Sequence, residues 1–292
     1  MKKEPLTESE ENLEEAKLLL ASKDDEMIAH STFTNESTFI RNYVFAIKKL
    51  NETLLKIFML AIAAGMFIGL AYVAIGMATK GIESSGIASL ISGLIFPLAI
   101  IMIVFIGGQL FTSNVMGLWP TIRRKVKVQK YLQNLIIVLI GNWIGILFLC
   151  LIVWGAGLFK HDAEYAAITM KYFDGKMKYT WIEIFFSGIL CNLLVAGSVW
   201  ISFSTNNTSA KIMLFILLIG AFVISGYSHV VANAFPWFSS MMIKGSSSEN
   251  WSQFAEFGYK VQLPTLFGNY LGGAVILPGI FYIVWNKKLG NQ

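Results

Sequence analysis

Long stretches without a charged side chain dominate the pattern of hydrophobic and polar positions in this chain. They cover Ile57 to Thr79, Ser84 to Ile122, Tyr131 to Phe159, Ile184 to Ala210, Ile212 to Ile243 and Val261 to Asn286. Each supplies the roughly 20 apolar residues that a membrane-spanning helix needs. The pattern therefore predicts an all-α polytopic membrane protein with six transmembrane helices.

The second and fifth stretches are too long for one straight helix and too short for two helices with a connection. Each contains a cluster of Gly, Ser, Thr and Asn, at Gly107 to Gly117 and at Ser225 to Asn233. Non-helical backbone at membrane depth is tolerated only where it lines a cavity or is buried in protein. We therefore predict that the second and fifth spans are broken helices whose breaks meet at a pathway.

The second break contains His229, within a stretch that no charged residue interrupts between Lys211 and Lys244. An ionisable group at this depth is costly to place and marks a functional site by default. The alternative is a neutral histidine that hydrogen-bonds a neighbouring helix and only holds the bundle together. The histidine by itself does not decide between the two.

A short sequence echo links the third and sixth spans. Gly141-Asn142-Trp143-Ile144-Gly145 corresponds to Gly268-Asn269-Tyr270-Leu271-Gly272, and the broken spans occupy matching places. The repeat unit is then three helices. Because three is odd, the two halves cross the membrane in opposite directions, which predicts a 3+3 inverted repeat with its site near the midplane.

The composition agrees with a membrane protein and excludes a soluble enzyme. Hydrophobic residues make up 55% of the chain and charged residues 14%, and the net charge of +5 lies at the ends of the apolar stretches, which gives no support to nucleic-acid binding. Cys150 and Cys191 lie inside apolar stretches as packing residues, so no disulfide, metal site or cofactor is expected. A membrane-embedded enzyme would need a second catalytic group, but the spans contain no Asp or Glu, and His30 and His161 lie outside them.

Residues 1–56 are expected to form a cytoplasmic N-terminal region, 57–286 the transmembrane domain and 287–292 a short tail. Thr7-Glu8-Ser9-Glu10 predicts a capped helix that runs through Leu20. Apolar residues at helical spacing, from Phe39 to Leu54, predict a second helix along the membrane interface, with a plain solvated helix as the alternative. Lysines and arginines, crowded between Arg123 and Lys130, favour cytoplasmic termini in a plasma-membrane protein.

Several motifs together resemble the formate–nitrite transporter family. They are Gly108-Gln109-Leu110-Phe111-Thr112-Ser113-Asn114, the run from Gly188 to Val195, Gly226-Tyr227-Ser228-His229-Val230-Val231-Ala232-Asn233, and the two Gly-Asn-aromatic echoes. The resemblance extends from about Ile57 to Trp285. It implies a homopentamer of aquaporin-like protomers, each with its own anion pathway.

The resemblance also assigns roles to residues. It places the first break opposite His229, lines the pathway with apolar constrictions on both sides of the histidine, and puts an anion-attracting lysine before the fourth span. The polar pathway residues are His229, Thr112, Asn192, Asn269 and Lys176; the outer constriction is Phe96 and Phe222, and the inner ring is Ile100, Leu110, Phe111 and Val195. In one departure, Ser228 stands where the family usually has an acidic residue, which puts the identity of the preferred anion in doubt.

Physical chemistry favours proton-linked transport through such a path. A bare anion pays heavily to cross apolar constrictions, whereas a neutral weak acid pays only for a polar group. A histidine, with a reference pKa of about 6.5, supplies or stabilises that proton near neutral pH, and Thr112 can fix its tautomer. The expected partners are lipid, protons and a small monovalent anion, formate first and nitrite next. Hydrosulfide or lactate transport and a neutral small-solute channel remain as alternatives.

Overall fold

The computed structural model describes residues 32–286, so the predicted helix at Thr7 to Leu20 and the short tail lie outside the described residues. Within the described range the chain is helical, apart from an isolated bridge between Thr32 and Thr205. The elements in chain order are α2 (Asn35–Asn51), α3 (Leu54–Thr79), α4 (Ser85–Ile95), α5 (Pro97–Phe105), α6 (Phe111–Asn114), η1 (Val115–Gly117), α7 (Leu118–Ile122), α8 (Val128–Gly155), α9 (Leu158–His161), α10 (Ala163–Met177), α11 (Trp181–Ser202), α12 (Thr208–Ile224), α13 (Ala234–Lys244), α14 (Ser248–Phe257), η2 (Gly258–Gln262), α15 (Leu263–Tyr270), η3 (Leu271–Ile276) and α16 (Leu277–Trp285).

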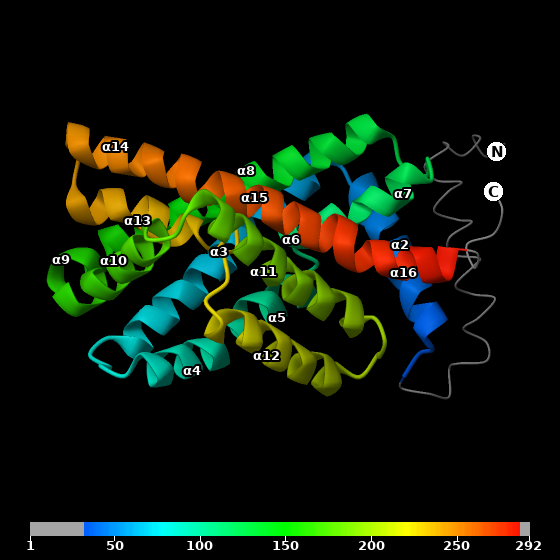
Figure 1. Ribbon diagram of the computed structural model, residues 1–292, viewed down its shortest axis with the longest axis horizontal. Helices are drawn as coiled ribbons and strands as arrows, with labels where there is room; N and C mark the ends of the chain where they lie inside the picture. The colour runs from blue at the N-terminus through cyan, green and yellow to red at the C-terminus, as the bar shows by residue number, and fades with distance from the viewer. Residues whose placement is uncertain (1–31, 287–292) are drawn as a thin grey trace, which may run out of the picture.

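The helices form an elongated bundle with two distinct ends. Helix α2 lies with α7 and α16 at one end, called the α2 end, and α9, α10, α13 and α14 gather at the other, called the α10 end (Figure 1). In the part of the chain that the structure describes, five helical stretches are long and apolar enough to cross a membrane, and α12 is a shorter apolar helix. Large apolar side chains on their outer faces are exposed, which is typical of helices that meet lipid.

Both spans are broken where predicted, but the first break is shorter than the predicted range of Gly107 to Gly117. Helix α5 ends at Phe105 and the chain resumes as α6 at Phe111, while α12 ends at Ile224 and α13 begins at Ala234. Gly107 and Gly226 open the two breaks with φ angles of +74° and +67°. Only glycine adopts this conformation without a steric penalty, so these two residues allow the chain to leave the helix.

Glycines bring the long helices into close contact around the breaks. A Cβ on Gly145 of α8 would lie 2.0 Å from the Ile62 carbonyl oxygen of α3, and a Cβ on Gly268 of α15 would lie 2.2 Å from the Phe185 carbonyl oxygen of α11. These separations exclude any larger residue unless the helices move apart. The Gly-Asn echoes therefore lie at two tight helix crossings, one in each half of the chain.

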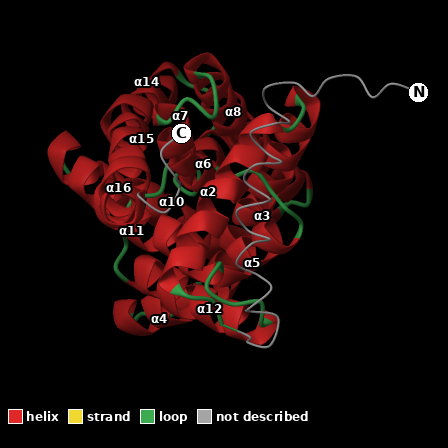
Figure 2. Ribbon diagram, turned by 90° about the vertical axis from the view of Figure 1, so that its right-hand side faces the viewer, coloured by secondary structure: helices red, strands yellow, loops and turns green. Residues whose placement is uncertain are grey.

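Helix α2 differs from the predicted interfacial helix. Phe39, Tyr43, Ile47 and Leu50 are buried, and the Phe39 ring lies 6.1 Å from the Trp200 ring of α11. The helix ends at Asn51, so Leu54 belongs to α3 and is exposed. Viewed from the α2 end, α2 lies near the middle of the bundle (Figure 2). Its apolar face therefore covers the protein core, because the same helical spacing suits either lipid or a neighbouring helix.

The last span also begins earlier than predicted. Helical structure continues from Ser248 to Trp285, and Ser247 caps its start by accepting a hydrogen bond from the Asn250 backbone N–H. The predicted start at Val261 followed the onset of apolar sequence, whereas this cap allows a polar first segment, α14, to extend the helix. Two π-helical segments, η2 and η3, lie within the stretch.

Candidate functional site

His229 and Thr112 face one another across the two breaks. Thr112 Oγ1 lies 3.1 Å from His229 Nε2, and both residues are buried. On the other side of the ring, His229 Nδ1 accepts the backbone N–H groups of Val231 at 3.2 Å and Ala232 at 3.1 Å. A neutral imidazole with an accepting Nδ1 carries its proton on Nε2, so His229 donates to the Thr112 hydroxyl. The break thus fixes the tautomer.

Thr112 is consequently able to donate its own hydroxyl hydrogen. Its oxygen accepts from the imidazole, which leaves the hydroxyl proton for a third group. The Thr112 backbone carbonyl accepts Asn192 Nδ2 at 3.1 Å, and the same amide donates to the Asn269 carbonyl at 2.7 Å. Asn192 therefore links the first break to the last span and holds Thr112 in place.

Asn142 and Asn269 hold the two breaks in the same manner. Asn142 accepts the Phe111 backbone N–H and donates to the Ala61 and Gln109 carbonyls. Asn269 accepts the Val230 backbone N–H and donates to the Gly188 and Ser228 carbonyls. Each asparagine satisfies two buried backbone groups at a break, as backbone at membrane depth requires, and ties the break to a carbonyl of a long helix, α3 or α11.

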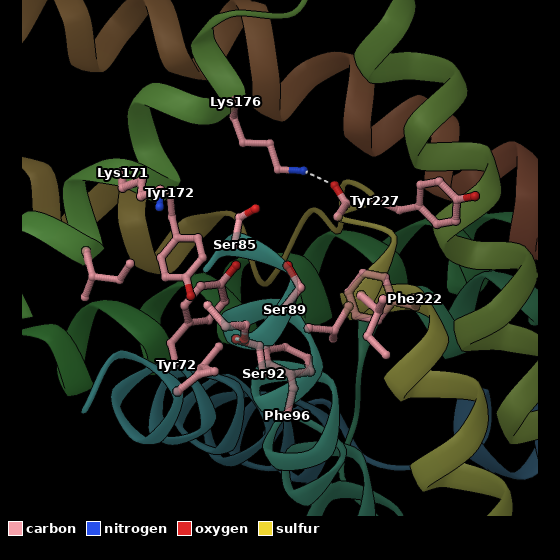
Figure 3. A pocket seen from close by; sticks show the side chains of 16 residues that line it. Tyr72, Ser85, Ser89, Ser92, Phe96, Lys171, Tyr172, Lys176, Phe222 and Tyr227 are labelled. Carbon is pink, nitrogen blue, oxygen red and sulfur yellow. Dashed lines mark hydrogen bonds between the residues drawn. The ribbon is translucent and has the colours of Figure 1, made fainter. Parts of the chain in front are cut away.

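A cavity of about 270 Å³ opens at the α10 end, here called the outer cavity. Figure 3 shows it between Tyr72, Tyr172 and three serines, with Lys176 at the top, Phe96 at the bottom and Phe222 to the right. The Phe96 and Phe222 rings meet edge to face at 5.8 Å, and the Phe222 ring lies 5.9 Å from the imidazole of His229. The aromatic pair therefore separates the outer cavity from the histidine. Among the residues that the structure describes, no Asp or Glu lines this cavity.

Lys176 is positioned by the second break. Its Nζ donates to the Gly226 carbonyl at 2.7 Å (Figure 3) and to Ser228 Oγ at 3.1 Å. The residue lies in the last turn of α10, a helix where the sequence indicated a loop. Desolvation lowers the pKa of Lys176 to about 8. Ser228, the departure from the family pattern, is thus a neutral partner of the lysine.

A smaller cavity of about 30 Å³ lies at the α2 end and is here called the inner cavity. Ile100 lines it, together with Lys49, Ser113, Ser202 and apolar neighbours. The other predicted inner-ring residues, Leu110, Phe111 and Val195, are buried and line neither of these two cavities. The structure thus places only one member of the predicted inner ring at the inner cavity.

Sequence reasoning missed Lys49. Its Nζ donates to Ser113 Oγ and to Asn114 Oδ1, both at 3.0 Å, although these partners lie 64 and 65 residues away along the chain. A common sequence separation could have pointed to Lys49. Ala61 and Gly188, which bond Asn142 and Asn269, are 188 − 61 = 127 residues apart, and 269 − 142 and 176 − 49 also give 127. Lys49 and Lys176 are thus separated by the same number of residues as the two asparagines.

Comparison with known proteins agrees with this architecture. The family model for formate/nitrite transporters matches residues 37–284. The formate channel FocA of Haemophilus influenzae is 32% identical over 240 residues, covering 77% of this chain and 84% of FocA, and FocA of Escherichia coli strain K12 is 30% identical over 250 residues, covering 80% and 88%.

Solved structures show the same similarity. A pentameric formate channel with formate bound superposes with a TM-score of 0.68 at 30% identity, covering 80% of this chain and 96% of that one. An ion channel of the same family, at 24% identity and a TM-score of 0.74, covers 85% and 98% and supports the fold. The chain, an integral membrane protein, belongs to the formate/nitrite transporter family.

Proposed function

We propose that this protein transports small monovalent anions of weak acids, formate first and nitrite next, in a proton-linked process that depends on His229. The observation that carries the proposal is the buried His229–Thr112 pair, which lies behind the Phe96–Phe222 constriction and a cavity lined by lysines. The family consists of channels and transporters, and relatives of about 30% identity are formate channels. Transport is therefore the activity to be explained.

The proposed path begins in the outer cavity, where the Lys176 ammonium raises the local concentration of anions. The aromatic constriction beneath it disfavours hydrated ions by dewetting. At the histidine, Nδ1 first takes a proton from the aqueous path, and the resulting imidazolium passes its Nε2 proton to the Thr112 hydroxyl, which gives its own hydrogen to the anion. One proton enters the pair for each one that leaves. The step requires the Val231 and Ala232 N–H groups to release Nδ1, which couples it to the conformation of the break.

We also propose six membrane crossings in a 3+3 inverted repeat, assembled as a homopentamer in the plasma membrane. Matching asparagine contacts and the common offset of 127 residues support the repeat. Basic residues between Arg123 and Lys130 favour a cytoplasmic α2 end. The likeness to a pentameric formate channel supports the assembly. Residues 57–286 form the transport domain, and the α10 end faces outward.

Flux in proteoliposomes tests the proposed substrate class. We expect rapid flux of formate and nitrite and slow flux of lactate and glycerol, because the constriction selects by size and the lysines select by charge. Liposomes without protein correct for passive diffusion of the free acids. Glycerol flux without formate flux would instead favour the neutral-solute channel. Hydrosulfide flux above formate flux would change the preferred substrate within the same fold.

The first break is predicted to limit substrate size. Leu110→Ala or Phe111→Ala should widen the constriction and raise lactate flux about tenfold relative to formate flux, since one or two lost apolar contacts are worth about 1–3 kcal/mol. The measurement is the lactate-to-formate flux ratio in proteoliposomes. An unchanged ratio in both variants would show that these side chains do not form the constriction.

Lys176 is predicted to affect the capture of the anion in the outer cavity and not its passage through the constriction. Lys176→Glu should slow formate uptake at low external concentration by about tenfold and leave the maximal rate near the wild-type value, since steering by charge acts before the constriction. The effect should shrink at high salt, because at about 0.15 M salt the screening length is only about 8 Å. Lys178→Glu, an exposed neighbour, is the matched control. Equal low-concentration rates at low salt in wild type and Lys176→Glu would refute the capture role.

A further inference from the structure

Lys49 places a buried ammonium group against the first break. The residue lies near the end of α2 and is 9% exposed. Its Nζ donates to Ser113 and Asn114 and lies 5.0 Å from the centre of the Phe45 ring. Buried lysines are rare unless paired with a carboxylate. Here the two hydrogen-bond partners are a hydroxyl and a carboxamide.

The surroundings of this ammonium group are neutral. Asn114 in turn donates to the Gln109 and Asn134 side-chain oxygens, so the bonded network contains no acid. Several charged and titratable side chains near the α2 end have other partners: Lys130 donates to Asn51, Tyr131 to the Val115 carbonyl and Arg123 to the Asn286 carbonyl, and the Tyr282 ring stacks on Trp119. The carboxylate of Glu52, the residue that follows α2, accepts a hydrogen bond from Lys56 at 2.7 Å. On α2 itself the nearest charged residue is Lys48, which is exposed. Among the described residues, no carboxylate bonds the Lys49 ammonium group.

Lys49 and Lys176 thus form a matched pair. They are separated by the same 127 residues as the repeated asparagines, each donates only to uncharged oxygens of a break, and each lines a cavity at its own end of the bundle. Apart from these two residues and Lys171, the side chains lining the two cavities are neutral. The charge that an anion meets in the inner cavity itself therefore depends on the protonation of Lys49.

We propose that Lys49 is a proton-operated switch for anion entry from the α2 end: its charged form captures the anion and its neutral form does not. This inference rests on the proposed anion transport. The neutral amine still donates hydrogen bonds to Ser113 and Asn114, so the break stays anchored in both states. The switch is therefore electrostatic and needs no change of fold.

The sign of the pH dependence follows from burial. Desolvation lowers the pKa of Lys49 to about 7, and no carboxylate opposes this shift. The residue is therefore charged below about pH 7 and neutral above it. Lys176, whose pKa is lowered only to about 8, stays charged over a further interval. Between these values, entry from the α10 end is favoured over entry from the α2 end.

Oriented membrane vesicles test this proposal. Formate entry at low concentration and low salt is measured from pH 5.5 to 8.5 in inside-out and right-side-out vesicles, for wild type and Lys49→Arg. Arginine stays charged throughout, so the ratio of the two rates cancels every other pH effect. We expect a wild-type to Lys49→Arg ratio near one at pH 6 that falls about tenfold by pH 8.5 for entry from the α2 end. Entry from the α10 end should show no such fall.

Two further variants separate charge from structure. Asn114→Asp places a carboxylate within hydrogen-bond distance of the Lys49 ammonium group, where it cancels the charge that attracts the anion. We therefore expect slow formate entry from the α2 end at every pH, with no decline as pH rises. Lys48→Arg, on the exposed side of α2, should keep the wild-type profile. If formate is transported but the wild-type to Lys49→Arg rate ratio for entry from the α2 end does not change with pH, the proposed switch is wrong. A pH profile of Asn114→Asp that matches the wild-type profile would also overturn it. Absence of formate flux in wild type, in both orientations, would instead overturn the proposed function.

Discussion

Replacing His229 by phenylalanine is expected to abolish the pH dependence of formate flux and to lower the rate about a hundredfold, the low end of what a positioned proton donor contributes. Phenylalanine keeps a planar ring of similar size but removes the Nε2 proton that Thr112 accepts and the Nδ1 acceptor of the Val231 and Ala232 N–H groups. The measurement is formate flux in proteoliposomes from pH 5 to 8. An unchanged pH profile would exclude the histidine from the proton step.

Thr112 provides the matched test of the same pair. Thr112→Ser keeps the hydroxyl and should keep the wild-type pH profile, whereas Thr112→Val keeps the shape and should behave like His229→Phe. A valine variant with normal pH dependence would show that the proton does not pass through this hydroxyl. Protein yield and elution as an intact oligomer confirm that each variant is folded.

Asn269→Leu is expected to have the largest effect on stability. The substitution leaves the Val230 N–H and the Ser228 carbonyl at the break without their partner in a buried site, and it removes the bond to the Gly188 carbonyl of α11. Each unsatisfied buried group costs about 1–3 kcal/mol, so the two groups at the break together cost at least about 2 kcal/mol. The expected result is a markedly lower melting temperature in detergent and little formate flux.

Asn142→Leu should be destabilised to a similar extent, because Asn142 makes the matching three bonds at the first break. Asn206→Leu, at an exposed position, is the control and should melt like wild type. If Asn269→Leu also melted like wild type, the asparagine would not be what holds the break in place.

Much of this architecture could be predicted because membrane burial leaves strong local signals. The absence of charge located the spans, and clusters of Gly, Ser, Thr and Asn located the breaks, since backbone polar groups in lipid need partners. The opposition of Thr112 and His229 came from the family resemblance, and the structure brings the two within hydrogen-bond distance. The Gly-Asn echo pointed to the helix crossings at which both asparagines act.

The rest depended on contacts between distant parts of the chain. The spacing of Phe39, Tyr43 and Ile47 predicts an apolar face but does not say whether lipid or protein covers it, and here protein covers it. Lys49 looked like one basic residue among several near the membrane. Only the packing of α2 shows that its ammonium group turns inward to Ser113 while that of Lys48 stays exposed.

Ser228 gains a physical meaning from the structure. Its hydroxyl oxygen accepts a hydrogen bond from the Lys176 ammonium group, and its backbone carbonyl accepts one from the Asn269 side-chain amide. A carboxylate at this position would pair with the lysine and cancel its charge, whereas serine leaves the charge available to an anion. Lys49 is bonded to neutral groups as well, so within residues 32–286 each of these two lysines lies at a cavity without a carboxylate bonded to it.

The stoichiometry of protons and formate tests the central claim most directly. In proteoliposomes with a clamped membrane potential, formate uptake and lumenal acidification are recorded together with a trapped pH indicator, and protein-free liposomes correct for passive formic acid. Proton-linked transport predicts one proton for each formate and a rate that does not change with membrane potential. Formate uptake that carries a current, follows the membrane potential and leaves the lumenal pH unchanged would contradict the account.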